Sequence, residues 1–128
     1  MLIGIMNLDA GVYIVIFYMP KDRTIQIGRL GRFRFRQGVY FYVGSAQRNL
    51  SARIERHNQK KKTLRWHIDY LSARSEMLGA ITITGPRELE CQLAKKLSSM
   101  FEPAVHGFGA SDCRCAGHLF YVKDLAKI

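Results

Sequence analysis

Acidic residues, prolines and cysteines are all scarce in this chain of 128 residues. The three prolines leave no linker or low-complexity stretch, and no internal repeat is visible, so we expect one domain over residues 1–128. The three cysteines are too few, and odd in number, to staple a secreted fold. The apolar run near the start covers only residues 11–20, well short of the roughly 20 apolar residues that span a bilayer. We therefore expect a reduced, soluble, cytoplasmic protein, associated with the nucleoid if its source is prokaryotic.

The shortage of acids leaves a net charge of +10, and two segments carry all of the excess. Residues 21–36 and residues 48–62 each hold six basic residues against one acidic residue. Arginine alternates with phenylalanine over residues 32–36, so a strand would present its arginines on one face, where they could follow a phosphate backbone. A solvated strand face is the plainer alternative. The candidate nucleic-acid contacts are Arg32, Arg34, Arg36, Arg48, Arg56, Lys60, Lys61 and Lys62.

The pattern of apolar and turn-forming residues predicts a small α/β (α+β) domain with a central, mostly antiparallel sheet flanked by helices. Strands are expected over residues 11–18, 24–28, 31–36, 39–44, 78–84 and 118–122. Asn49 and Thr63 are each expected to cap a helix, the second with residues 64, 68 and 71 on its apolar face. A third helix is expected from Pro86 to about Phe101, ended by Pro103.

Glu90 is the most informative acid, because the predicted third helix places it inside an apolar arc, whereas Glu88 points the other way. An unpaired carboxylate on an apolar face is costly unless it is neutralised, paired or bound to a cation. Two interpretations stay open. One is an ion pair with an arginine from a neighbouring element, and the other is a site for Mg²⁺, which often uses one or two carboxylates.

Several side chains of the first two predicted helices have both a structural and a functional interpretation. Arg53 and His57 are four residues apart, so they share a helix face and suit a phosphate, although an ordinary surface pair is common at this spacing. His67 falls on the apolar face of the second helix, where we expect a core histidine satisfied by hydrogen bonding. Trp66 and Tyr70 are expected to pack in the protein rather than to stack on bases.

The cysteines offer a zinc site as a further alternative. Cys113 and Cys115 are followed by His118, and Cys91 is available as a fourth ligand. The C-x-C spacing departs from the usual zinc knuckle, so buried structural thiols are the simpler account. The loop over residues 107–112 is rich in glycine, which can simply serve its turns.

Two short motifs resemble the paired motifs of the GIY-YIG nuclease superfamily. Gly11-Val12-Tyr13 is similar to the first motif, and Tyr42-Val43-Gly44, followed by Ser45-Ala46, is similar to the second. The similarity continues, in the order and helical spacing of such nucleases, through Leu50, Arg53, His57 and Glu90. Residues 66–71, 90–91 and 107–115 look like a subgroup known as a domain of unknown function, sometimes joined to endonuclease III-type repair glycosylases.

The resemblance implies a GIY-YIG-like fold and a divalent-metal-dependent endonuclease that hydrolyses DNA phosphodiester bonds, in DNA repair or processing. It implies that Tyr13 and Tyr42 face the scissile phosphate, Arg53 stabilises its charge, His57 assists, and Glu90 holds one Mg²⁺ or Mn²⁺ ion. We expect Tyr13 to act as the base, which requires its pKa to fall below the ordinary value of about 10. The expected partners are DNA and a DNA-repair protein that supplies specificity, with no membrane involved.

Three departures from the family's pattern are visible. The motif tyrosines are farther apart than the family commonly shows, which predicts an inserted arginine-rich hairpin on the DNA-binding side. The family's late asparagine has no evident counterpart, and Ser111, Asp112 and His118 are the candidates to replace it. The distance in sequence from Tyr42 to Arg53 is one residue longer than in proteins with a similar pattern. Two other functions stay open: a non-catalytic nucleic-acid-binding module with a degenerate nuclease site, and a small zinc-stabilised interaction domain.

Overall fold

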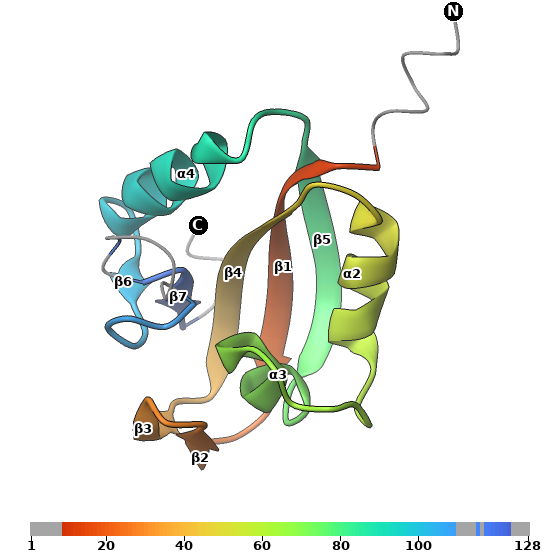
Figure 1. The fold of residues 1–128 in the computed structure, drawn as a ribbon. Coiled ribbons are helices and arrows are strands. Elements are labelled where there is room, and N and C mark those ends of the chain that lie inside the picture. The colour runs from red at the N-terminus through yellow and green to blue at the C-terminus, as the bar shows by residue number, and fades with distance from the viewer. Residues whose placement is uncertain (1–8, 110–114, 116, 124–128) are drawn as a thin grey trace, which may run out of the picture.

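The computed structural model describes residues 9–109, 115 and 117–123. Its main sheet has five strands in the order β5-β1-β4-β7-β6, and every neighbouring pair is antiparallel (Figure 1). The strands are β1 Gly11–Met19, β4 Gly38–Ala46, β5 Glu76–Ile83, β6 Glu102–Pro103 and β7 Leu119–Val122. This architecture confirms the predicted α+β class and its mostly antiparallel sheet.

The predicted hairpin forms a second, two-stranded sheet. It consists of β2 Arg23–Ile27 and β3 Gly31–Phe35, which pair with each other and lie at one end of β1 and β4 (Figure 1). Ile25, Ile27 and Phe35 are buried in the core, while Arg32 and Arg34 are exposed. The alternation of apolar and basic residues therefore separates a core face from a solvent face, as the strand pattern predicts.

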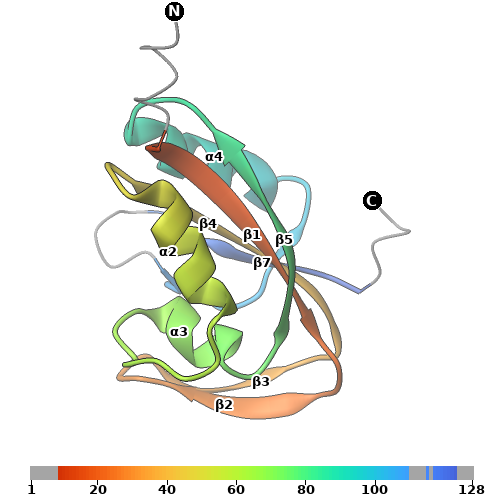
Figure 2. The same ribbon diagram turned by 90° about the vertical axis from the view of Figure 1, so that its right-hand side faces the viewer.

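Helices cover both faces of the main sheet (Figure 2). The helices α2 Leu50–Asn58 and α3 His67–Ser72 lie on one face, over a core that includes Val15, Phe17 and Tyr40. The helix α4 Glu88–Ser98 packs on the other face, over Val12 and Val43. Because successive strand residues alternate between faces, β1 contributes to both cores.

The register of β1 and β4 brings the two motif tyrosines to the same face. Tyr13 lies opposite Gly44, and Val15 lies opposite Tyr42, so both phenol rings point to the side of α2 and α3. The strand β7 pairs with β4 only as far as Tyr42, and one further backbone bond joins Val43 N to His118 O. The last residues of β4 extend beyond β7, and at this end elements from both faces can meet.

The predicted helix starts need two corrections. Asn49 does precede α2, but it has a φ of 54° and makes no side-chain cap bond. The cap is instead Asp9, whose Oδ1 accepts hydrogen bonds from the backbone N and Oγ of Ser51 at 2.8 and 2.7 Å. Thr63 caps no helix, because α3 begins only at His67.

The expected strands all form, and the predicted third helix corresponds to α4. The observed bounds differ from the predicted ones by a few residues, and Pro86 precedes the helix. The short strand β6 replaces the simple stop that Pro103 was expected to make. Within the described part of the chain, no helix combines the length and apolar character that crossing a membrane requires.

Candidate functional site

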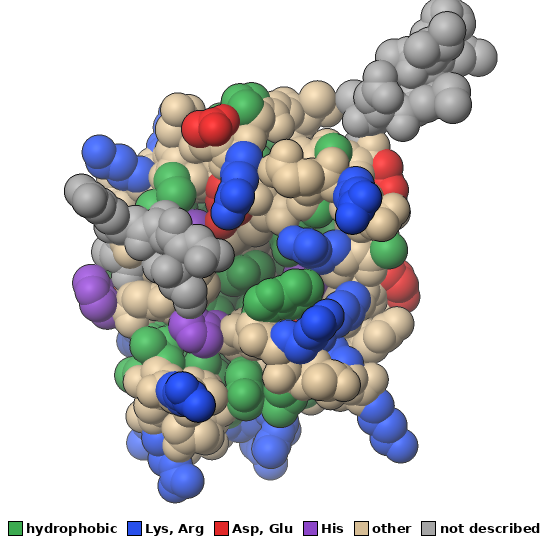
Figure 3. All heavy atoms as spheres, in the orientation of Figure 1, with side chains coloured by type: hydrophobic (Ala, Val, Ile, Leu, Met, Phe, Trp, Pro, Cys, Tyr) green, Lys and Arg blue, Asp and Glu red, His purple; other side chains and the backbone are tan. Residues whose placement is uncertain are grey.

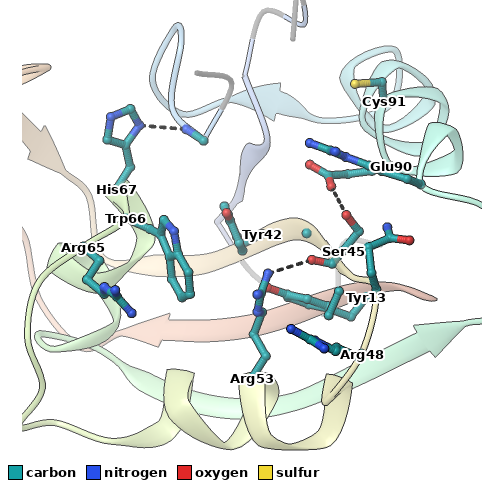
Figure 4. A pocket seen from close by; sticks show the side chains of 15 residues that line it. Tyr13, Tyr42, Ser45, Arg48, Arg53, Arg65, Trp66, His67, Glu90 and Cys91 are labelled. Carbon is teal, nitrogen blue, oxygen red and sulfur yellow. Dashed lines mark hydrogen bonds between the residues drawn. The ribbon is translucent and has the colours of Figure 1, made fainter. Parts of the chain in front are cut away.

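A cavity of about 450 Å³ opens where β4 extends beyond β7 (Figure 4). The tyrosines Tyr13 and Tyr42 line it, and Glu90 is the acid in its described lining. Its basic residues come from α2, from the segments before α2 and α3, and from the residue before α4. They are Arg48, Arg53, Arg65 and Arg87. A cavity with this charge balance suits a phosphate group together with one cation.

Tyr13 is held from behind by a buried histidine. The hydroxyl of Tyr13 lies 2.9 Å from Nε2 of His57, which is 1% exposed. Burial lowers the pKa of His57 to about 4, so the ring is neutral at pH 7. Its Nδ1 is buried without a hydrogen-bond partner among the described residues. When Nε2 accepts from the Tyr13 hydroxyl, the hydrogen of the neutral ring is on Nδ1 and stays unsatisfied there.

Both motif tyrosines keep their protons at neutral pH. Burial raises the pKa of Tyr13, and the charge of Arg53 opposes this rise only in part. Burial also raises the pKa of Tyr42. The protein alone therefore does not supply the lowered Tyr13 pKa that a free phenolate base requires. The proton of Tyr13 needs an acceptor, and Nε2 of His57 is the group in contact with it.

The ring of Tyr13 has room only because residue 44 is glycine. A Cβ added at Gly44 would lie 2.6 Å from both the Cζ and the hydroxyl oxygen of Tyr13. The ring cannot move aside easily, since it is 2% exposed and touches His57 and Tyr42, with ring centroids 5.5 and 6.5 Å away. The glycine of the second motif thus leaves the space that the tyrosine ring of the first motif occupies.

We expect Gly44→Ala to lower the free energy of unfolding by about 1–3 kcal/mol, because overpacking a filled core forces its neighbours to shift. Gly79→Ala is the matched control, since Gly79 is also in a strand and its added Cβ would meet no atom within 4 Å. Denaturant unfolding of both variants checks the prediction. Equal stability of the two proteins would show that Gly44 does not make room for Tyr13.

Arg53 projects from α2 into the cavity (Figure 4). Its Nη1 donates to the carbonyl oxygen of Ser45 at 3.0 Å, and its guanidinium lies 4.9 Å from the ring centroid of Trp66. These contacts come from β4 and from the residue before α3, so they fix the guanidinium beside the two tyrosines. Arg53 and His57 are therefore no ordinary surface pair: one faces the cavity and the other is buried beneath it.

Glu90 reaches the same cavity from the opposite face of the sheet. Its Oε1 accepts a hydrogen bond from Oγ of Ser45, and its Oε2 lies 2.9 Å from Nδ1 of His118. Burial alone would raise the pKa of Glu90, but the hydrogen bonds from His118 and Ser45 outweigh it, and the pKa falls below its usual value. Of the two open interpretations, the ion pair with an arginine is not found among the described residues, where serine and histidine hold this carboxylate.

Glu90 is suited to be the protein ligand of a hard divalent cation. It is ionised and its side chain is 20% exposed, and each oxygen keeps a lone pair beyond the hydrogen bond that orients it. Magnesium commonly takes one or two carboxylates and completes its shell with water and substrate phosphate. The donor set in the described lining is consistent with one such ion.

Asp69 holds in place the segment just before α3, which forms one wall of the cavity. Its carboxylate is fully buried and accepts hydrogen bonds from the backbone N of Arg65 and Trp66 at 2.8 and 2.9 Å. It also accepts two bonds from Arg56, at 2.6 and 3.0 Å. Burial raises the pKa of Asp69, but these hydrogen bonds outweigh it and lower the pKa. The buried pair thereby presents Trp66 and His67 to the cavity.

A family model described as a domain of unknown function, DUF123, matches residues 12–128. The chain belongs to the DUF123 family. DUF123 is a GIY-YIG-like family, in agreement with the two motifs that β1 and β4 bring together. No curated protein and no solved structure matches the chain significantly.

The basic residues predicted to contact nucleic acid have diverse surroundings in this DUF123 domain. Arg48 lines the cavity, and the space-filling view shows Lys and Arg side chains around the hollow on this side of the molecule (Figure 3). Arg32 and Lys61 are exposed. The others contact carboxylates, backbone carbonyls or a hydroxyl within the chain: Arg34 with Asp22, Arg36 with Glu102, Arg56 with Asp69, Lys60 with Ser75, and Lys62 with Ser72.

Two aromatic interpretations change. His67 is only partly buried and lines the cavity, where its Nδ1 accepts a hydrogen bond from the backbone N of Gly109 at 2.9 Å. Trp66 is 37% exposed on the cavity wall, with the guanidinium groups of Arg53 and Arg56 over its ring. Packing alone does not explain an exposed indole. Tyr70 does pack against the core, as expected.

Sequence reasoning missed Arg65, Arg87 and Ser45 as cavity residues. Arg65 is placed by Asp69 rather than by a helix, and Ser45 turns toward Glu90 because β7 ends early. The signal in the sequence for Arg65 was its position directly before Trp66 and His67. Ser111, Asp112 and Cys113 lie outside the described residues.

Proposed function

We propose that the DUF123 domain is an endonuclease that hydrolyses a DNA phosphodiester bond in the arginine-lined cavity, with one bound Mg²⁺ or Mn²⁺ ion. The observation that carries this proposal is a convergence. Tyr13 from β1, Tyr42 from β4, Arg53 from α2 and Glu90 from α4 line one cavity, although α2 and α4 pack on opposite faces of the sheet. The resemblance of the two motifs to GIY-YIG nucleases supports the same chemistry.

Tyr13 and His57 provide the route for the proton of the attacking water. As the water oxygen forms a bond to phosphorus, its proton passes to the oxygen of Tyr13, and the tyrosine proton passes to Nε2 of neutral His57. The 2.9 Å contact supports this transfer, and a concerted shift of the two protons avoids a free phenolate, which the raised pKa of Tyr13 disfavours. Burial disfavours the His57 imidazolium as well, so His57 holds the proton only during the reaction. The bond from phosphorus to the leaving nucleoside oxygen then breaks, and solvent returns a proton to that oxygen.

The remaining residues manage charge. Arg53 is held by Ser45 and Trp66, so its guanidinium can stabilise the additional negative charge of the pentacovalent phosphorus without reorganising. When bound at Glu90, the divalent ion would supply Lewis-acid polarisation of a phosphoryl oxygen and stabilisation of the leaving oxygen. Arg48, Arg65 and Arg87 would hold the flanking phosphates. Tyr42 would orient the scissile group.

We expect Glu90→Gln to remove metal-dependent DNA cleavage while leaving DNA binding largely intact, because the amide is a poor ligand for a hard cation. Glu88→Gln is the matched control. Glu88 lies on the same helix but is exposed and outside the cavity lining, so the control should cleave as the natural sequence does. Cleavage is followed on plasmid DNA in Mg²⁺, with binding measured separately in Ca²⁺ or EDTA.

Undiminished cleavage by Glu90→Gln would show that the metal site is assigned wrongly. Tight, salt-sensitive DNA binding by the natural sequence without any turnover would support the alternative function, a non-catalytic nucleic-acid-binding module.

A further inference from the structure

Three sulfur and nitrogen ligands gather next to the cavity. Cys91 lies on α4, Cys115 lies in the segment before β7, and His118 immediately precedes β7. One ligand atom of each lies within 4.8 Å of the others. The two cysteines are partly buried and His118 is 1% exposed, so the cluster sits inside the protein rather than on an open surface.

The spacing of the cluster fits a tetrahedral ion. With metal–sulfur bonds of about 2.3 Å and metal–nitrogen bonds of about 2.0 Å, ligand atoms around zinc lie roughly 3.5–4 Å apart. The observed limit of 4.8 Å is therefore close to the geometry of a loaded site. Only small side-chain adjustments separate the two.

His118 is already oriented for such an ion. Its Nδ1 faces Oε2 of Glu90 at 2.9 Å and the carbonyl oxygen of Val43 at 3.3 Å, and both are acceptors. This arrangement favours the tautomer with hydrogen on Nδ1, in which Nε2 is the nitrogen that can bind a metal. A histidine that binds zinc through one nitrogen commonly donates its other N–H to a carboxylate or a carbonyl.

The type of ligand selects the ion. Two thiolates and one imidazole are typical of zinc, whereas magnesium prefers oxygen ligands such as the carboxylate of Glu90. We propose that Cys91, Cys115 and His118 bind a zinc ion that links Cys115 and the start of β7 to α4, distinct from the divalent ion proposed at Glu90. The ion would hold Glu90 in place in two ways: His118 contacts the carboxylate of Glu90, and Cys91 is the next residue in the sequence.

Metal analysis of the full chain tests this site without any need for cleavage. The protein is purified in reductant without chelator, and about one zinc ion per chain is expected for a site with these ligands. Cys91→Ser and His118→Asn should each lose most of the zinc. His106→Asn, which changes an exposed histidine outside this cluster, should retain it.

Cobalt titration provides a second readout in case a variant fails to fold. The natural protein, stripped of metal and shown by circular dichroism to be folded, should develop thiolate-to-cobalt charge-transfer absorption that zinc then abolishes. A natural protein that holds no zinc and gives no such absorption would overturn the proposal, as would full zinc content in Cys91→Ser. Zinc bound without DNA cleavage would support this site and count against the nuclease alone.

Discussion

Replacing Arg53 by alanine is expected to lower kcat for DNA cleavage by about 10²–10³-fold, the usual cost of removing a preorganised group that stabilises transition-state charge. The guanidinium is fixed by Ser45 and Trp66 before substrate binds, so its loss removes stabilisation that water replaces poorly. Arg53→Lys should recover only part of the rate, because an ammonium keeps the charge but not the planar fork. Single-turnover cleavage with saturating protein measures the chemical step.

Arg74→Ala is the control for a general loss of positive charge, since Arg74 is exposed and is not part of the cavity lining. It should change the affinity for DNA slightly and leave kcat unchanged. Equal rates for Arg53→Ala and Arg74→Ala would remove Arg53 from the catalytic site.

Replacing Asp69 by alanine is expected to lower the free energy of unfolding by about 3–5 kcal/mol, as is usual when one partner of a buried ion pair is removed. Arg56 would lose its carboxylate, and the backbone N–H groups of Arg65 and Trp66 would lose their acceptor. Cleavage should fall as well, because the cavity wall depends on the same carboxylate. Denaturant unfolding near neutral pH measures the stability term.

Asp22→Ala is the matched control, because Asp22 forms an exposed ion pair with Arg34 at 2.7 Å. Exposed pairs contribute about 0–1 kcal/mol, so this variant should stay close to the natural sequence. Comparable losses in the two variants would contradict the structural role given to the buried pair.

The contribution of Asp69 should also depend on pH. The fold lowers the pKa of this carboxyl below its unfolded value, so the stabilisation is fully present above the unfolded pKa. It is lost as the pH falls through the folded pKa. The difference in stability between the natural sequence and Asp69→Ala should therefore shrink in acid.

Local pattern was sufficient to predict much of the fold. The alternation in residues 32–36 predicted an exposed basic face on β3, and the helical pattern of α4 placed Glu90 inside an apolar arc. Both features depend only on the geometry of a single strand or helix. Glu90 and Arg53 were therefore recognisable as candidate site residues, although their positions relative to each other were not.

Long-range contacts decided the rest. Asp9 caps α2 although it lies far from that helix in the sequence. Asp69 accepts hydrogen bonds from the backbone N of Arg65 and Trp66, which lie in the stretch where Thr63 was expected to begin a helix. These hydrogen bonds to Asp69 hold Trp66 in its exposed position. A pattern within one element carries no information about a partner in another, so the wall of the cavity could not be predicted.

The most direct measurement of the central claim is cleavage of supercoiled, branched and single-stranded DNA by the natural sequence in Mg²⁺, Mn²⁺ or EDTA, beside Tyr13→Phe. The account predicts cutting that EDTA abolishes and that Tyr13→Phe slows by about 10²–10⁴-fold, the usual contribution of general acid–base catalysis. No cutting of any of these DNA forms in either metal, by a folded protein that binds them, would contradict it.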